Sequence, residues 1–242
     1  MKGSGRTLFL DFGTHEASEI RSLVCRSRLS RAWLAKTCLI HSKFRVDGFR
    51  NLWAYVWGAS LSKAQVRQID LVMVEPFATR GISDVIGDCA FGSSTFFNSV
   101  VSNSCDTFKT LYLAHDSLGH SLYSSKPRLS GRSVEVLNMQ ISKLINLLVA
   151  DGRISGWDKV IVRLNIEGAE TEVLDAILSH EDLVDCEFLF MGSLGDIGKC
   201  HGEDALKKYE AMLERFERKF VWFTSNPNSW HRARAQIREY LE

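Results

Sequence analysis

The chain has 242 residues, of which 45% are hydrophobic and 24% are charged, and it contains three prolines. These values match those of soluble globular proteins and argue against a fibrous, disordered or linker-rich chain. The formal net charge of +1 conceals one strongly basic segment, because ten Lys and Arg residues and a single acid lie between residues 21 and 68.

The length favours a single α/β domain, spanning residues 1–242, that carries an insertion. Only three consecutive apolar residues precede Asp11, so no secretory signal forms, and no apolar run approaches the roughly 18 residues of a membrane span. The six cysteines form no Cys-x-x-Cys pair and no zinc-finger spacing. We therefore expect a cytoplasmic protein with reduced thiols, without a metal site or a membrane segment.

Short apolar runs bounded by turn residues predict eight strands. In chain order they cover residues 7–12, 70–74, 84–90, 108–113, 133–137, 159–164, 186–191 and 220–223. Apolar residues at helical spacing predict the helices between them, at about 18–40, 48–68, 141–150 and 203–218 and after Asn228. The Ser-, Asn- and Gly-rich region 92–132 is expected to hold loops and edge strands.

Strands separated by helical stretches of ten or more residues pair in parallel through right-handed crossovers. The sequence therefore predicts an α/β fold with a Rossmann-like, doubly wound, mostly parallel sheet. The basic segment would form a helical insertion at about 18–68, after the first strand.

Ligands of such sheets bind beyond the carboxyl ends of the strands. The first strand ends in Asp11-Phe12-Gly13 and the second in Glu75-Pro76. A glycine there lets a ligand approach the backbone, and an acid after the second strand suits a ribose diol. Because the turn is acidic and lacks Gly-x-Gly-x-x-Gly, a cationic cofactor without phosphate, such as S-adenosylmethionine, is favoured over a dinucleotide.

Three stretches, LFLDFGTHEASEI, VMVEP and KVIVRLNIEGAETEVLDAI, resemble the FkbM-type S-adenosylmethionine-dependent methyltransferases. Members of that family carry Asp-x-Gly after the first strand, Glu-Pro after the second and Asp-x-Glu-Gly-x-Glu after the fourth. The resemblance covers residues 7–16 and 70–223. It implies a class I methyltransferase fold and methylation of a hydroxyl on a sugar or another small acceptor.

The resemblance also implies roles for individual residues. Asp11 and Gly13 would contact the methionine side of the cofactor, and Glu75 its ribose. Asn165 and Glu167 would be the catalytic positions of the last motif.

Three further positions complete the expected site. His15 lies in the same turn as Gly13 and is placed at the cofactor. Glu170 closes the last motif and is placed on the substrate side, although acids in the first turn of a helix also favour its macrodipole. Asp196 is expected in a flexible substrate-side loop within Gly192-x-x-Gly195-x-x-Gly198.

The sequence departs from the family pattern at Asn165, which replaces an aspartate, and at Ala17, which replaces the second glycine of the turn. An amide can hold a hydroxyl but cannot accept its proton. Two hypotheses follow: an enzyme that acts by positioning the acceptor in line with the methyl group, or a methyltransferase-like module that has lost turnover and binds nucleic acid or protein.

The basic segment at 21–68 also has two interpretations. Its interleaved aromatic residues can pack inward and leave Lys and Arg as a solvated face. Alternatively, positive charge beside stacking side chains forms a surface for RNA or another polyanion. The second interpretation favours an anionic acceptor and allows an RNA ribose 2′-O-methyltransferase.

Overall fold

A computed structural model of the chain describes residues 6–15, 17, 20, 61–115, 119–151, 157–183, 186–192, 194–215, 219–222 and 235–241. Most of the expected basic insertion lies outside these residues. Of the two helices expected there, the structure describes Ile20 and the short helix α4 (Lys63–Arg67).

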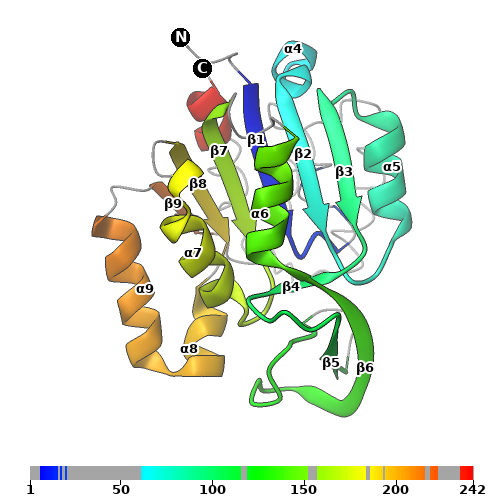
Figure 1. The fold of residues 1–242 in the computed structure, drawn as a ribbon, viewed down its shortest axis with the longest axis vertical. Coiled ribbons are helices and arrows are strands. Elements are labelled where there is room, and N and C mark those ends of the chain that lie inside the picture. Colours follow the sequence, from blue (N-terminus) through cyan, green and yellow to red (C-terminus); the bar gives the residue numbers. More distant parts are fainter. Residues whose placement is uncertain are drawn as a thin grey trace, which may run out of the picture.

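The centre of the fold is a parallel sheet with the strand order β3-β2-β1-β7-β8-β9, and every neighbouring pair runs parallel (Figure 1). The strands are β1 (Arg6–Phe12), β2 (Ile69–Val74), β3 (Ser93–Phe97), β7 (Trp157–Leu164), β8 (Glu187–Gly192) and β9 (Lys219–Trp222). The chain order reverses between β1 and β7, which is the topological switch point of a Rossmann-like sheet. The predicted α/β fold with a parallel, Rossmann-like sheet is confirmed.

The central strands are mainly apolar because both faces of the sheet are covered. On β1, Leu8 and Leu10 enter one core cluster while Phe9, between them, enters the other. Helices α6 (Ile141–Ala150), α7 (Glu170–Ser179) and α9 (Glu203–Arg215) cover the first face (Figure 1). The second face packs against α5 (Arg80–Asp88), and against helical residues 235–241 through Ile237 and Tyr240.

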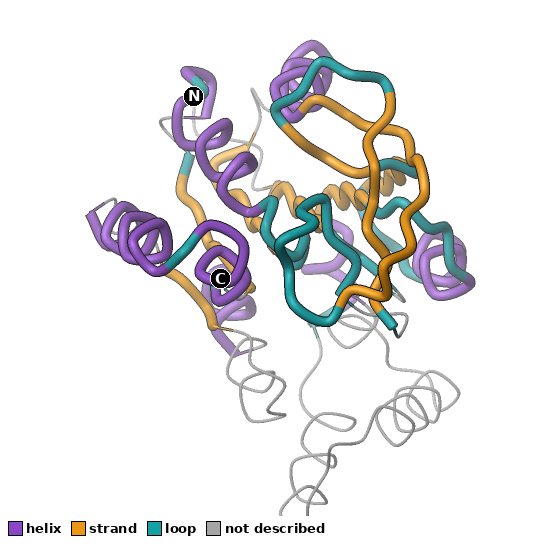
Figure 2. Tube along the Cα trace, turned by 90° about the horizontal axis from the view of Figure 1, so that it is seen from below, coloured by secondary structure: helices purple, strands orange, loops and turns teal. Residues whose placement is uncertain are grey.

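A second sheet of three strands, which we call the arm sheet, lies beyond the carboxyl ends of the main strands (Figures 1 and 2). It consists of β4 (Val100–Ser102), β5 (Phe108–Ala114) and β6 (Leu129–Gln140). The central strand β6 pairs in parallel with β4 and antiparallel with β5. The arm sheet therefore occupies the edge at which Rossmann-like folds bind ligands.

One predicted strand is wrong, because residues 84–90 belong largely to helix α5. The hydroxyl of Thr79 caps this helix by accepting the N–H of Ile82 at 3.4 Å. Ile82 and Val85 lie three positions apart on one face of the helix, and both are buried in the core. The main-sheet strand that follows β2 along the chain is β3 instead, an edge strand in the region 92–132 that was expected to hold loops and edge strands.

The remaining elements lie close to their predicted positions. The predicted strand at 133–137 is the middle of β6, which has 12 residues. The predicted helix at 141–150 matches α6, and the one at 203–218 is described as far as Arg215.

Candidate functional site

The turn after β1 begins with Gly13, which has a φ of 77°. A Cβ atom added there would lie 2.0 Å from the carbonyl oxygen of Asn165. The Gly13 N–H donates to the Val74 carbonyl at 2.9 Å, and the Asn165 N–H donates to the Phe12 carbonyl at 3.0 Å. The ends of β1, β2 and β7 are thus joined backbone to backbone around a residue that must be glycine.

Two residues of this turn that are not glycine also have a left-handed backbone. His15 has a φ of 50° and Ala17 a φ of 52°. The Ala17 N–H donates to the Thr14 carbonyl at 2.9 Å, which closes the turn. Ala17 stands where the family resemblance expects a glycine, and it adopts the conformation that glycine adopts most readily.

Asp11 lies beneath the turn rather than in a cavity. Arg163, its neighbour in the register of β1 and β7, donates to the Asp11 carboxylate at 2.5 Å and to the Gly13 carbonyl at 3.2 Å. The two side chains are 0% and 4% exposed, so this is a buried ion pair. Asp11 thus supports the turn and does not line the cavity described below, and its predicted contact with the cofactor stays a prediction.

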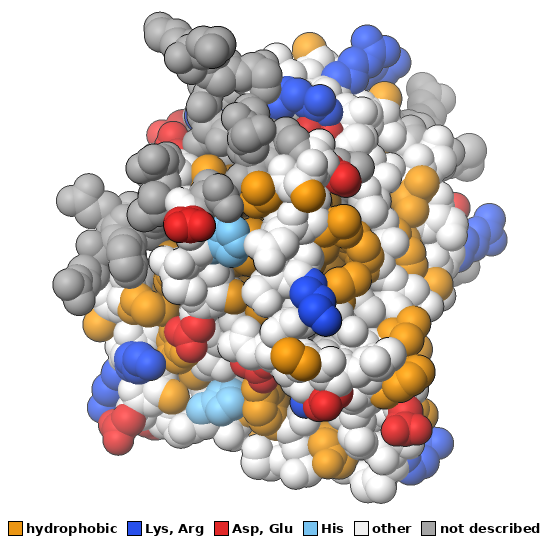
Figure 3. Space-filling view, viewed as in Figure 1, with side chains coloured by type: hydrophobic (Ala, Val, Ile, Leu, Met, Phe, Trp, Pro, Cys, Tyr) orange, Lys and Arg blue, Asp and Glu red, His pale blue; other side chains and the backbone are white. Residues whose placement is uncertain are grey.

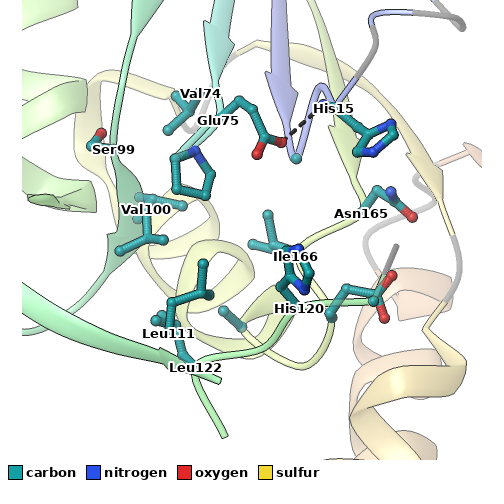
Figure 4. Close-up of a pocket in the computed structure, with 16 residues that line it drawn as sticks. His15, Val74, Glu75, Ser99, Val100, Leu111, His120, Leu122, Asn165 and Ile166 are labelled. Carbon is teal, nitrogen blue, oxygen red and sulfur yellow. Dashed lines mark hydrogen bonds between the residues drawn. The ribbon is translucent and has the colours of Figure 1, made fainter. Parts of the chain in front are cut away.

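Glu75, directly after β2, faces the open space beyond the strand ends (Figure 4). Its carboxylate accepts the N–H of His15 at 2.8 Å and the N–H of Phe77 at 3.3 Å. Burial raises the pKa of this carboxyl, and the two N–H donors oppose that shift. Each carboxylate oxygen has two lone pairs, so both oxygens keep acceptor capacity for hydroxyls of a ligand.

A cavity of about 90 Å³ lies between these strand ends and the arm sheet (Figure 4). Its polar lining includes five of the predicted site residues: Gly13, His15, Glu75, Asn165 and Glu167. The arm sheet contributes Val100, Val101 and Leu111 to the apolar lining. Residues far apart in the sequence thus meet around one space, as the positions of the strand ends predicted.

Ser99, after β3, also lines this cavity (Figure 4). Its side chain is buried, with 6% of the residue exposed, and its hydroxyl has no hydrogen-bond partner among the described residues. A buried hydroxyl without a partner costs about 1–3 kcal/mol, and such groups point to a missing water or ligand. The sequence analysis did not single out this residue.

Glu170 shapes the turn between β7 and α7. Its carboxylate accepts the N–H of Ile166 at 3.2 Å and the N–H of Gly168 at 2.6 Å. Desolvation raises the pKa of Glu170 to about 7. Because Glu170 is 1% exposed and does not line the cavity, it holds its own turn in place, and the structure does not place it at a substrate.

Glu167 has a left-handed backbone in this turn, with a φ of 57°. Its carboxylate forms an ion pair with Lys126 from the β5–β6 connection, and its carbonyl accepts the hydroxyl of Ser121 at 2.7 Å. The Lys126 ammonium also donates to the Gly119 carbonyl at 3.1 Å. Glu167 lines the cavity, but its charge is neutralised by a lysine that is itself nearly buried.

Asp196 lies in helix α8 (Gly195–His201), so the prediction of a flexible loop at this position is wrong. The carboxylate is bound by Lys199 at 2.7 Å and lies 3.9 Å from Lys126. Burial lowers the pKa of Lys126, and the charge of Asp196 opposes that shift. Asp196 does not line the cavity; it supports the lysine that holds Glu167.

Two more side chains of this region escaped the sequence analysis. A signal existed for Arg163, because a charged residue within an apolar buried strand needs a buried partner. Lys126 offered no such signal, because its role depends on how the β5–β6 connection folds back over the β7–α7 turn.

Among the residues that the structure describes, no group of three or more His, Cys, Asp or Glu side chains is arranged to hold a metal ion. Within the same part of the chain, no helix is long and apolar enough to cross a membrane. Comparisons with models of protein families, with curated proteins and with solved structures found no match for this chain. The site itself therefore provides the evidence on function.

Proposed function

We propose that the chain is an S-adenosylmethionine-dependent methyltransferase of the class I type that methylates a hydroxyl oxygen of a small acceptor. The observation that carries the proposal is the meeting of Glu75 and Ser99 in one cavity beside the Gly13 turn. A carboxylate after the second strand, next to a glycine turn after the first, is the nucleoside-binding arrangement of Rossmann-like sheets. The unpartnered Ser99 hydroxyl supplies a further group that a ligand would satisfy.

The turn after β1 favours a nucleoside cofactor without phosphate. Pyrophosphate groups bind to backbone N–H donors at such turns. Here the N–H groups of Gly13, His15 and Ala17 already donate within the protein, to Val74, Glu75 and Thr14 respectively. The negative charge of Glu75 also favours a cationic ligand over an anionic one.

The residues present fit S-adenosylmethionine in three parts. Glu75 would accept the two ribose hydroxyls, and the turn at Gly13 and His15 would lie beside the methionine part. The base would extend in the opposite direction, toward Ser99 and Val100. When bound, S-adenosylmethionine supplies a methyl group on a positively charged sulfonium.

Asn165 would orient the acceptor, because it lines the cavity at the end of β7 and an amide can bind a hydroxyl oxygen or its proton. In-line positioning of the oxygen provides much of the rate enhancement expected for such a transfer. Glu167 would hold the turn in shape through Lys126 rather than accept a proton.

One observation favours a second candidate function, a binding module without turnover. Asn165 cannot accept a proton, and the Glu167 carboxylate is neutralised by Lys126, so the motif presents no unpaired carboxylate of its own. RNA binding through residues 21–68 and ribose 2′-O-methylation stay predictions, because most of that segment lies outside the described residues.

Isothermal titration with S-adenosylhomocysteine tests the proposal, using Glu75→Gln and the control Glu187→Gln. Glu187 is an exposed acid at the start of β8, at the opposite end of the sheet. Hydrogen bonds to charged groups are worth about 1.5–3 kcal/mol, so Glu75→Gln should weaken binding by about tenfold or more. The control should bind like the wild type.

Absence of binding to the wild-type chain, or equal affinity in the two variants, would contradict the proposed site. A radiolabelled transfer assay separates the two candidate functions. Cofactor binding without transfer to any hydroxylated acceptor would favour the binding module.

A further inference from the structure

The side of the cavity opposite Glu75 is largely apolar, with His120 beside its leucines, and comes mainly from the arm sheet and the β5–β6 connection (Figure 4). Leu111 of β5 and Leu122 of the β5–β6 connection lie across the space from Glu75 (Figure 4). Val101 of β4 and Ile166 of the β7–α7 turn also line the cavity. A ligand gains affinity at such a surface by burying apolar area of its own.

The charges on this side of the cavity are matched. Lys126 pairs with Glu167, and Asp196 pairs with Lys199. The carboxylate of Glu75 on the opposite side is bound by backbone N–H groups. On the molecular face drawn in Figure 3, acidic and basic side chains of the described residues are likewise scattered among apolar and neutral ones. Among the described residues that line the cavity there is no Lys or Arg, so an anionic ligand would meet the charge of Glu75 without a lysine or arginine to balance its own charge.

The apolar side is fixed in place before any ligand arrives. The Ser121 hydroxyl and the Lys126 ammonium hold the β5–β6 connection on Glu167. The Tyr123 hydroxyl adds a hydrogen bond to the Glu172 carboxylate on α7, at 2.6 Å. Leu122 is thus anchored by the residues on either side of it.

From these observations we propose that the arm sheet forms the acceptor-binding wall, and that the acceptor is a neutral molecule with an apolar ring or chain beside its hydroxyl. The inference rests on the proposed function, because Asn165 and Ile166 place this wall next to the expected methyl donor. In the transfer the acceptor oxygen gains the methyl group and loses its proton to water, and the electrons of the broken bond stay on sulfur. It is an alternative to the anionic acceptor expected from the basic segment, most of which lies outside the described residues.

A matched pair of probes tests this assignment: 4-methylphenol, which is neutral, and 4-methylphenyl phosphate, which is anionic. Their affinities for the full chain, saturated with S-adenosylhomocysteine, are measured by ligand-observed NMR. We expect the phenol to bind at least tenfold more tightly than the phosphate. Equal or tighter binding of the phosphate, or no binding of either probe, would overturn the proposal.

Leu122→Asn, compared with Leu147→Asn, locates the binding surface. Leu122 is half-buried at the cavity, whereas Leu147 is an exposed leucine on α6. A lost apolar contact in a pocket changes affinity by about tenfold or more, so Leu122→Asn should weaken phenol binding by that factor and Leu147→Asn should leave it unchanged. Equal affinities in the two variants would refute the wall even if the wild type distinguishes the two probes.

The outcome is separable from that of the proposed function. If S-adenosylhomocysteine fails to bind while phenol binding depends on Leu122, the cofactor assignment fails and the apolar wall stands. If S-adenosylhomocysteine binds and the phenol does not, the acceptor class alone is refuted.

Discussion

Replacing Glu170 by Gln should remove a pH dependence from the stability of this protein. Glu170 is fully enclosed, and desolvation raises its pKa from the ordinary value of 4.5 to about 7. Between these two values the folded chain holds a proton that the unfolded chain has released. The stability that protonated Glu170 contributes is therefore fully present below about pH 4.5 and is lost as the pH rises to about 7.

The size of the effect follows from the shift. Each pKa unit corresponds to 1.36 kcal/mol, so the wild-type chain should lose about 3 kcal/mol of unfolding free energy over this interval through Glu170. Glu75 contributes in the same direction, because burial raises its pKa too. The Gln variant keeps the contribution of Glu75, so the difference between the two proteins isolates Glu170.

Urea unfolding at about pH 5 and about pH 8 measures this difference. An amide oxygen can replace only part of the carboxylate that accepts the N–H groups of Ile166 and Gly168, so the variant also carries a constant loss of about 1 kcal/mol. Glu187→Gln, at an exposed position, should keep the pH dependence of the wild type. If the unfolding free energies of the wild type and Glu170→Gln differ by the same amount at both pH values, the reasoning is refuted.

Three further predictions concern the turn after β1. Gly13→Ala should destabilise the chain by more than about 2 kcal/mol in urea, because its Cβ would collide with the Asn165 carbonyl; an unchanged midpoint would contradict this packing. Ala17→Gly should raise stability by up to about 1 kcal/mol by relieving a left-handed alanine, and thermal unfolding that shows a clear loss would count against it. Arg163→Met should lower the unfolding free energy by about 3–5 kcal/mol, because it leaves Asp11 buried without its cation. The double variant Asp11→Leu/Arg163→Met should recover much of that loss, and a double-mutant cycle measures the difference.

The main sheet could be predicted because its strands are identified by their apolar composition. Buried parallel strands such as β1, β2 and β7 carry apolar residues on both faces, so short apolar runs located them. The segment around Val85 misled the prediction because a short run with spaced apolar residues fits either a strand or a helix. The capping bond from Thr79 decided in favour of the helix.

The site could be predicted where backbone topology alone places a residue. Gly13, Glu75 and Asn165 follow strands of one sheet, so their meeting at one cavity required only the correct strand order. Ser99 and Lys126 depend on β3 and on the docking of the β5–β6 connection, which no sequence pattern revealed. The Glu170 carboxylate points inward and accepts two backbone N–H groups of its own turn. Sequence composition does not show this orientation.

The buried pair of Asp11 and Arg163 joins residues separated by 152 positions in the chain. During synthesis, Asp11 therefore leaves the ribosome long before Arg163, the cation that pairs with it. Until β7 emerges, the Asp11 carboxylate lacks the guanidinium that neutralises its charge. Closing the apolar core around β1 is then more costly, so the amino-terminal half should stay open. Chains cut short before β7 should accordingly be degraded or held by chaperones instead of persisting as a stable half-domain.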